Sequence, residues 1–342
     1  MSAVIRFVLA PAISVLIPAY DAARTLASAL ESLQRQSQTD WECIVVDDGS
    51  RDRTPEIAAA FARRDARVRL VECRHGGIVA ALQAGIAECR APLIARFDAD
   101  DLMSRRRLEL QREALERCPA LAAVGCHVRL FPRAALREGR LGYEAWLRSI
   151  DTPEQLEREA FVECPLAHPT LLIRRSVLLD FGYRDRGWPE DYDLVLRILH
   201  AGQRLGVVPQ RLLHWRDSAG RLSRVSERYS QAAFVECKAE FLASGFLAES
   251  DRYLLWGFGD TGKALANALA RRGKHPEAII ELHPGRLGQR IRGVPVVPPA
   301  ALRGASSRPL IVSVAGVGPR TEIRQALSAM GFCELRDYVC AA

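Results

Sequence analysis

The sequence has none of the segments that direct a chain to or through a membrane. Nothing near Met1 combines a basic region, an apolar core and a small-residue cleavage site, and no apolar run approaches the roughly 20 residues that span a bilayer. Its nine cysteines are an odd number, and no two of them form a C-x-x-C pair. This pattern disfavours a disulfide framework and a zinc site. We therefore expect a soluble, cytoplasmic protein with reduced thiols.

Lysine is almost absent, because Lys238, Lys263 and Lys274 are the only lysines and arginine supplies the other basic residues. The net charge is nevertheless +7, and the pI is about 9.1. An excess of positive charge favours anionic partners. We expect a phosphorylated substrate and, as a further interaction, peripheral contact with an acidic membrane at its inner face. No nucleic-acid partner is expected.

The chain has 342 residues, which is more than one hydrophobic core usually serves, so two domains are expected. In the first third of the chain, strand-like and helix-like stretches alternate, which predicts βαβ units and a mostly parallel sheet. The runs ISVLI and CIVV are uninterrupted by polar residues, as expected for strands covered by helices on both faces. The predicted strands are Ile13–Ile17, Trp41–Val46, Val68–Val71 and Leu93–Arg96, and the predicted helices are Thr25–Gln36, Thr54–Arg64 and Gly77–Glu88.

The pattern is mixed from about Leu121 onward, and residues 253–256 then open a second alternation of strands and helices. We predict a long helix over residues 226–243 and place the domain boundary between 243 and 251, which gives domains 1–243 and 251–342. The second is expected to be a smaller Rossmann-like α/β domain, and a surface through which the chain could form oligomers. The other predicted strands are Ala122–Leu130, Thr170–Arg174, Ala278–Glu281, Val294–Val297 and Leu310–Val314, and the other predicted helices are Tyr143–Ile150, Pro153–Phe161, Asp260–Arg272 and Thr321–Met330.

Three carboxylates follow the predicted strand Leu93–Arg96 in the segment Asp98-Ala99-Asp100-Asp101. Hard oxygen ligands at this spacing suit Mg²⁺ or Mn²⁺. The alternative is a polar turn that caps a helix beginning near Ser104. The arginines at 105–107 come next, and we expect them to form a solvated helix face, with a phosphate clamp as the alternative.

Five segments of the first half occur in a characteristic order: ISVLIPAYD, WECIVVDDGSRDRT, HGGIVAALQAGIAECR, LIARFDADD and WPEDYDLVLRI. This set, over roughly residues 12 to 225, resembles the family-2 glycosyltransferases of the GT-A fold. The resemblance implies inverting, metal-dependent transfer of a sugar from a nucleoside-diphosphate donor to a carbohydrate or lipid-linked acceptor. A bacterial surface polysaccharide or glycoconjugate would be the product.

The resemblance also assigns a nucleotide-binding set at the strand ends. Asp48 would accept a hydrogen bond from the base, Asp47 would support that loop, and the glycine-lined segment at Gly77 would lie near a phosphate. Asp98 would face the ribose and share the metal with Asp100, which would be its main ligand. The remaining members of the set are Pro18, Ala19 and Tyr20, which would hold the base.

Asp191 is the candidate general base, because it matches the central acid of the family's E-D-x-D-L segment. Single displacement with inversion needs only one base beside the acceptor hydroxyl. Glu190, His168, His214 and Arg216 are further candidates for contact with the acceptor or the diphosphate. Relatives often carry a late histidine in an R-x-H arrangement, but here Asp217 stands where that histidine would fall, so a third metal ligand stays open.

The second half contains a G-x-G-x-x-G segment at Gly257, Gly259 and Gly262, after a predicted strand and before a predicted helix, with Glu281 beyond it. This context is typical of a dinucleotide fingerprint. We expect a ligand-binding or assembly module, with bound NAD as the less favoured alternative. The competing functions are a NAD-dependent sugar-nucleotide oxidoreductase, for which no Tyr-x-x-x-Lys relay is found at Tyr253, and a non-catalytic nucleotide-binding protein.

Overall fold

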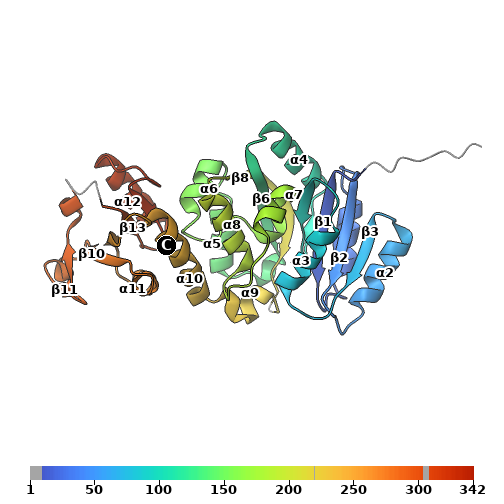
Figure 1. Cartoon of the computed structure of the whole chain (residues 1–342), viewed down its shortest axis with the longest axis horizontal. Helices are drawn as coiled ribbons and strands as arrows, with labels where there is room; N and C mark the ends of the chain where they lie inside the picture. Colours follow the sequence, from blue (N-terminus) through green and yellow to red (C-terminus); the bar gives the residue numbers. More distant parts are fainter. Residues whose placement is uncertain (1–9, 219, 303–307) are drawn as a thin grey trace, which may run out of the picture. The chain divides into compact units, whose positions relative to one another are not determined.

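The computed structural model describes residues 10–218, 220–302 and 308–342 (Figure 1). Contacts group the chain into two compact units. The first contains the chain up to Thr152 together with Leu166–Asp185 and Gln203–Ala219, and the second contains Pro153–Pro165, Arg186–Gly202 and the chain from Gly220 to the end. The predicted boundary at residues 243–251 falls inside the second unit, and the division into domains at that point stays a prediction.

The first unit is built on an eight-stranded sheet with the order β3-β2-β1-β4-β7-β6-β8-β5. The strands β1 to β4 pair in parallel, and Figure 1 shows β1, β2 and β3 side by side at the blue end of the chain. Strand β7 is antiparallel to both of its neighbours, and β5 is antiparallel to β8. The strands are β1 (Ile13–Ala19), β2 (Trp41–Asp47), β3 (Val68–Glu72), β4 (Leu93–Arg96), β5 (Leu102–Met103), β6 (Leu121–Phe131), β7 (Leu172–Arg174) and β8 (Arg204–Arg216).

Strands β1 and β2 are buried along their whole length, as the uninterrupted apolar runs predict. Helix α3 packs so closely on them that a Cβ added at Gly85 would lie 2.1 Å from Leu16 Cδ1, so a larger residue there would force the Leu16 side chain to move. The helices of this unit are α1 (Leu26–Gln34), α2 (Thr54–Arg64), α3 (Ile78–Glu88), α4 (Arg107–Arg117), α5 (Glu138–Leu147) and α7 (Arg175–Phe181), with short 3₁₀ turns η1 (Arg133–Ala135) and η2 (His168–Thr170).

The second unit contains a six-stranded sheet with the order β11-β12-β10-β9-β13-β14. Its strands pair in parallel except for the hairpin between β11 and β12. If β11 is left out and the other strands are numbered 1 to 5 along the chain, their order in the sheet is 3-2-1-4-5. This is the order found in doubly wound nucleotide-binding folds. The strands are β9 (Arg252–Trp256), β10 (His275–Ile280), β11 (Arg290–Ile291), β12 (Val294–Val297), β13 (Leu310–Val312) and β14 (Tyr338–Cys340).

Helices from three separate parts of the chain belong to the second unit. Apolar side chains of α10, α11, β9 and β10 share one core, to which Phe161 also packs. The helices are α6 (Pro153–Glu159), α8 (Glu190–His200), α9 (Leu222–Val225), α10 (Gln231–Phe241), α11 (Asp260–Ala270) and α12 (Val317–Ala329). The shorter turns are η3 (Glu227–Tyr229), η4 (Leu242–Phe246, a π-helical turn), η5 (Pro284–Arg286) and η6 (Pro299–Leu302).

The mixed α/β fold with a mostly parallel main sheet is as predicted. One local expectation, the long helix, is wrong, and so is the alternative in which Asp98–Asp101 cap a helix near Ser104. The helix expected over residues 226–243 is broken, because Ser230 caps a new helix by accepting a hydrogen bond from the amide of Ala233. The segment Asp98–Asp101 does not cap a helix near Ser104, because β5 follows it directly and α4 begins only at Arg107.

Candidate functional site

The loops that follow β1, β2 and β4 lie at one edge of the first sheet. Ala19 at the end of β1 is the register partner of Asp47 at the end of β2, and Leu16 of β1 is the partner of Arg96 at the end of β4. Pro18 and Ala19 are buried at this edge. The carboxyl ends of parallel strands are where open α/β sheets bind ligands. The nucleotide-binding residues predicted at these loops are therefore brought to a common edge.

Asp48 fixes the loop that leads into α3. Its buried carboxylate accepts hydrogen bonds from the amides of Gly76 (2.8 Å) and Gly77 (2.9 Å), and Nδ1 of His75 lies 3.0 Å from its Oδ2. Gly77 has a φ of +84°, which only glycine adopts easily, and it stands directly before α3. A carboxylate offers about four lone-pair sites, so Asp48 keeps capacity for one further donor.

Two groups beside Asp48 are open to a ligand. Tyr20 is exposed and stacks on His75, with ring centroids 4.3 Å apart, so the pair forms a flat surface beside the loop. Asp47 is buried and its Oδ2 accepts a hydrogen bond from the amide of Ser50 (3.1 Å), but its Oδ1 has no partner among the described residues. A buried carboxylate oxygen without a donor is costly, and it fits a role in which a ligand or water supplies the donor.

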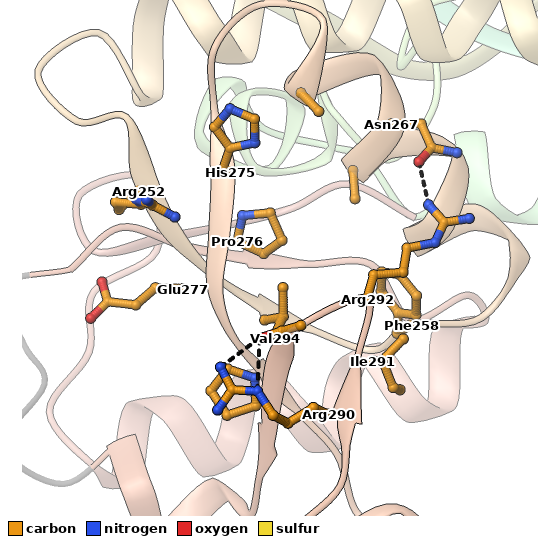
Figure 2. Close-up of a pocket in the computed structure, with 14 residues that line it drawn as sticks. Arg252, Phe258, Asn267, His275, Pro276, Glu277, Arg290, Ile291, Arg292 and Val294 are labelled. Atoms are coloured by element: carbon orange, nitrogen blue, oxygen red, sulfur yellow. Dashed lines mark hydrogen bonds between the residues drawn. The ribbon is translucent and has the colours of Figure 1, made fainter.

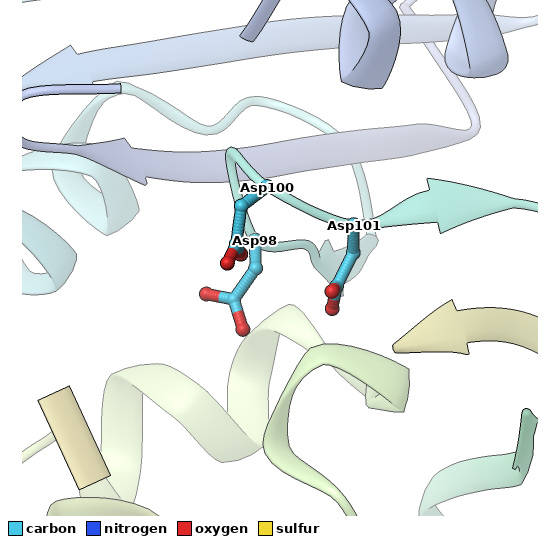
Figure 3. Close-up of side chains that lie close together, drawn as sticks. All are labelled: Asp98, Asp100 and Asp101. Carbon is cyan, nitrogen blue, oxygen red and sulfur yellow. The ribbon is translucent and has the colours of Figure 1, made fainter. Parts of the chain in front are cut away.

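Three carboxylates gather on the loop after β4. One oxygen each of Asp98, Asp100 and Asp101 lies within 4.8 Å of the other two, and Figure 3 shows the side chains pointing to the same side of the loop. Asp101 is fully buried, and its Oδ1 accepts a hydrogen bond from the amide of Arg216 (2.7 Å). Three carboxylates this close could together hold a cation. The hard oxygen donors and their spacing fit Mg²⁺ or Mn²⁺.

A buried arginine lies directly beneath these carboxylates, and sequence reasoning missed it. Arg96, the last residue of β4, is almost fully buried and forms an ion pair with Asp98. The backbone oxygen of Arg96 accepts a hydrogen bond from Nη2 of Arg107 (2.8 Å), whose Nε donates to Gln111 (3.0 Å). The side-chain amide of Gln111 donates in turn to the carbonyl of Thr170 (2.7 Å).

The expectation that residues 105–107 form a solvated helix face is therefore wrong for Arg107, which is fully buried. Its guanidinium holds the backbone beneath the carboxylate loop instead of facing solvent. A signal for this network was present in the sequence. Arg96 is a charged residue at the end of an apolar strand, and charged residues are almost never fully buried unless they are paired.

Arg216 and His214 approach the carboxylate loop from β8. Nε of Arg216 donates to the carbonyl of Asp100 (2.7 Å), and its guanidinium lies over the ring of Phe131, 4.5 Å from the centroid. His214 is the register partner of Leu102, two residues beyond Asp100. Burial and the nearby Arg129 lower the pKa of His214 below its usual value. Both predicted residues are thus close to the carboxylates along the sheet, and Arg216 positions their loop.

His168 lies in a different setting. It is buried, and its Nε2 is 2.8 Å from the hydroxyl of Tyr183. Burial, with a smaller contribution from the charge of Arg96, lowers the pKa of His168 well below its usual value, so the ring is held neutral. This arrangement is that of a packed, hydrogen-bonded histidine.

Glu190 and Asp191 belong to the second unit, in the first turn of α8. Glu190 is almost fully buried, and its two carboxylate oxygens accept from the hydroxyl of Tyr229 (2.9 and 2.7 Å). Asp193 is fully buried and accepts from Nε of Arg197 (2.6 Å). Asp191 is partly exposed, and its Oδ1 accepts from the amide of Tyr192 (2.8 Å). Of the three acids, Asp191 is thus the one that solvent reaches most easily.

Two glycines of the G-x-G-x-x-G segment, Gly257 and Gly259, lie between β9 and α11, and the third, Gly262, lies in the first turn of α11. Gly257 has a φ of +91°, and a Cβ at Gly262 would lie 2.5 Å from the carbonyl oxygen of Gly257, so both positions need glycine for backbone reasons. A Cβ at Gly259 would meet nothing within 4 Å. The carboxylate of Glu281 is engaged locally, because it accepts from the amide of Leu282 (2.8 Å) and from Nη1 of Arg286 (3.1 Å).

In the described part of the chain, no helix has both the length and the apolar character needed to cross a bilayer. The profile of the family described as Glycosyl transferase family 2 matches residues 14–182. EpsE of Bacillus subtilis (strain 168) is 31% identical over 226 residues, which are 64% of this chain and 78% of EpsE. The succinoglycan biosynthesis protein ExoO of Rhizobium meliloti (strain 1021) is 30% identical over 243 residues, 68% of each chain.

A solved structure shares the fold. The mannosyltransferase PcManGT from Pyrobaculum calidifontis, in complex with GDP-Man and Mn²⁺, superposes with a TM-score of 0.52 at 17% identity, over 95% of this chain and 82% of that one. At this identity the likeness concerns the fold alone. It agrees with the large, mostly parallel sheet and the smaller second sheet found here.

Proposed function

Because the chain belongs to glycosyl transferase family 2 and is a glycosyltransferase, we propose that it moves a sugar from a nucleoside-diphosphate donor to an acceptor hydroxyl, with inversion at the anomeric carbon. The product would be a bacterial surface polysaccharide or glycoconjugate, as the name of ExoO suggests for that relative. The acceptor would be a carbohydrate or a lipid-linked saccharide. Contact with an acidic membrane, favoured by the net charge of +7, belongs to the same proposal.

One observation carries the proposal: the carboxylates of Asp98, Asp100 and Asp101 converge at the edge of the sheet where Asp48 orders the neighbouring loop. In this arrangement the base would rest beside Tyr20 and donate to Asp47 or Asp48. The ribose would meet Asp98. The diphosphate would then lie next to the carboxylates, where its charge must be neutralised.

Asp98 and Asp100 would hold a divalent ion, with Asp101 as a further donor. When bound there, Mg²⁺ or Mn²⁺ stabilises negative charge on the departing nucleoside diphosphate. Arg96 keeps Asp98 in place from below, and Arg216 keeps the carbonyl of Asp100 in place from the side. The protein thereby fixes the donor end of the reaction before the acceptor arrives.

Asp191 would act as the general base. Its carboxylate takes the proton from the acceptor hydroxyl while the acceptor oxygen bonds to the anomeric carbon and the bond from that carbon to the phosphate oxygen breaks. Asp191 suits this role because it is partly exposed, whereas Glu190 is bound to Tyr229 and Asp193 to Arg197. The loop between β9 and α11, which contains Gly257 and Gly259, is called the glycine loop below. We assign it to ligand binding or assembly, with NAD as the less favoured ligand.

The donor site is tested with a thermal-shift panel of nucleoside diphosphates and their sugars, with and without Mn²⁺. Ligands that bind the folded state raise the melting temperature. We expect one nucleotide to stabilise the protein more strongly with Mn²⁺, and this extra stabilisation to vanish in Asp100→Ala. An unchanged metal response in Asp100→Ala would move the metal site elsewhere.

The base is tested with Asp191→Asn. The variant should lose transfer by about 1,000-fold, because no other group is assigned to take the proton, while its affinity for the nucleotide stays that of the wild type. Asp193→Asn is not a usable control, since that residue is buried in an ion pair. Equal losses of transfer and nucleotide affinity in Asp191→Asn would reject the assignment.

A further inference from the structure

The second unit contains a pocket that no part of the proposed reaction uses. Its volume is about 580 Å³, within the range of roughly 300 to 1,000 Å³ that small-molecule sites occupy. Apolar side chains of Phe258, Pro276, Ile291 and Val294 form part of its wall. Figure 2 shows basic side chains around this apolar part, at both of its sides.

Four basic residues line the pocket: Arg252, His275, Arg290 and Arg292. The single acid in the lining is Glu277, and Nε of Arg308 lies 3.4 Å from its carboxylate, so its charge is balanced from outside the lining. The pocket therefore carries an excess of positive charge.

The hairpin between β11 and β12 places two of these arginines. Its two-residue turn has φ values of +53° at Arg292 and +81° at Gly293, the combination found in type I′ turns. Arg290 donates from Nε (3.0 Å) and Nη2 (2.7 Å) to the carbonyl of Gly293, and Arg292 donates from Nη1 to Oδ1 of Asn267 on α11 (2.6 Å). The two guanidinium groups are thus held in place and still have N–H donors to offer, since each carries five.

The other two basic residues come from the amino ends of neighbouring strands. Arg252 begins β9 and His275 begins β10, and the two are register partners. The fingerprint glycines lie at the opposite end of β9, after Trp256. The basic pocket is therefore separate from the glycine loop, apart from the side chain of Phe258, which reaches it from that loop.

We propose that this pocket binds an anionic small molecule that carries carboxylate or phosphate groups at spaced positions and an apolar face between them. Figure 2 shows Arg252 and Arg292 on opposite sides of the pocket, so one compact anion would meet only part of the basic lining. The planar guanidinium groups match the geometry of both oxyanions. An acidic saccharide and a phosphate-bearing metabolite share this chemistry.

The test is hydrogen–deuterium exchange of the full-length protein with two probes that carry spaced anionic groups, trigalacturonate for carboxylates and fructose 1,6-bisphosphate for phosphates, at constant ionic strength without divalent metal. Peptides covering residues 252–258, 270–277 and 288–297 should become protected. Protection by trigalacturonate alone would identify the ligand as an acidic saccharide, protection by fructose 1,6-bisphosphate alone would identify it as a phosphate compound, and protection by both would show that the pocket accepts either oxyanion.

The double variant Arg252→Gln/Arg292→Gln should weaken this binding by tenfold or more. The matched control, Arg271→Gln/Arg336→Gln, removes the same charge from two exposed arginines outside the pocket and should bind like the wild type. No protection of these peptides by either probe, or equal weakening in both double variants, would overturn the proposal. Transfer activity does not enter this test, so its outcome is independent of the proposed reaction.

Discussion

The loop after β4 and the loop after β9 both begin at the carboxyl end of a strand near the middle of its sheet. The first carries Asp98, Asp100 and Asp101, and the second carries Gly257 and Gly259 and packs against Gly262 in the first turn of α11. Each is supported differently. A buried arginine and its hydrogen-bonded neighbours lie beneath the acidic loop, whereas the glycine loop is held by close backbone packing and by Ser313, whose hydroxyl donates to the carbonyl of Gly257 (2.7 Å).

The difference shows what each kind of loop requires from its surroundings. Carboxylates placed close together repel one another and need a buried positive charge or a bound cation. A loop that presents backbone amides needs no countercharge, but it needs residues without a Cβ. The two loops can therefore both follow a central strand and still differ in chemistry, because the residues below each loop differ.

The largest expected effect is on sugar transfer, which should depend on the loop after β4 and not on the loop after β9. Asp100→Ala should lower kcat/KM for sugar transfer by on the order of 100- to 1,000-fold, since it removes charge stabilisation from the leaving group. Gly259→Ala, whose new Cβ meets nothing, should leave transfer unchanged. A steady-state transfer assay checks both. Loss of transfer in Gly259→Ala would mean that the two loops act on one reaction.

The next effect concerns the buried support of the acidic loop. Arg96→Met should lower the free energy of unfolding by about 3 kcal/mol, because it leaves Asp98 without its buried partner. Urea unfolding measures this loss. Arg35→Met, which removes an exposed arginine 4.0 Å from Glu31, is the control and should cost less than about 1 kcal/mol.

The same pair can be tested for coupling. Asp98→Asn introduced into Arg96→Met removes the orphaned charge and should recover part of the lost stability, as expected for residues in direct contact. Strictly additive losses would show that Arg96 stabilises the loop through groups other than Asp98.

The support of the glycine loop predicts a smaller effect. Gly262→Ala should destabilise the second unit by about 1 to 3 kcal/mol, because its Cβ would lie 2.5 Å from a backbone oxygen that cannot move away easily. Gly259→Ala in the loop itself should cost less than about 1 kcal/mol, the usual range for a helix N-cap. Amide exchange in β9 and α11 reports the difference, and equal costs would show that packing at Gly262 is unimportant.

The last comparison is the pH dependence of stability, which differs between the two units. Burial holds His168 neutral in the folded state, so the unfolded state alone takes up a proton below about pH 6.5, and stability falls by up to about 1.4 kcal/mol per pH unit as the pH drops further. Burial lowers the pKa of Lys238 to about 8, so the folded state releases this proton first and stability rises with pH between about 8 and 10.4.

Unfolding measured from pH 5 to 10 in wild type, His168→Gln and Lys238→Met checks this response. His168→Gln should reduce the pH dependence of the unfolding free energy only below about pH 6.5, and Lys238→Met should reduce it only above about pH 8. A change in both windows from a single substitution would contradict the assignment of the two slopes to these groups.

The strands and turns of the first half could be predicted because their signals are local. The strands β1 to β4 follow from apolar runs, and the acidic and glycine turns follow from their own residue types. The burial of Arg107 could not be predicted in the same way, because it depends on Gln111 and on the backbone of β4, which only the fold brings together. Strand β8 was missed because its middle is polar, with exposed residues from Pro209 to Arg211.

The basic pocket lay beyond sequence reasoning for a similar reason. Its arginines are separated by a helix and two strands, and arginine is common throughout this chain. What distinguishes them is the hairpin turn at Arg292 and Gly293, which brings two of them to the pocket that the amino ends of β9 and β10 also line.

The second unit is assembled from three separate stretches of the chain. This limits where the protein can be cleaved or recombined without breaking contacts inside that unit. Lys238 donates to the carbonyls of Val162 and Ala341, and Glu159 pairs with Arg324, so three distant stretches of sequence are tied together. A chain that stopped after residue 243 would leave Glu159 without Arg324 and Lys238 without the carbonyl of Ala341. Exchange of this C-terminal module between relatives would thus have to replace residues 153–165 at the same time.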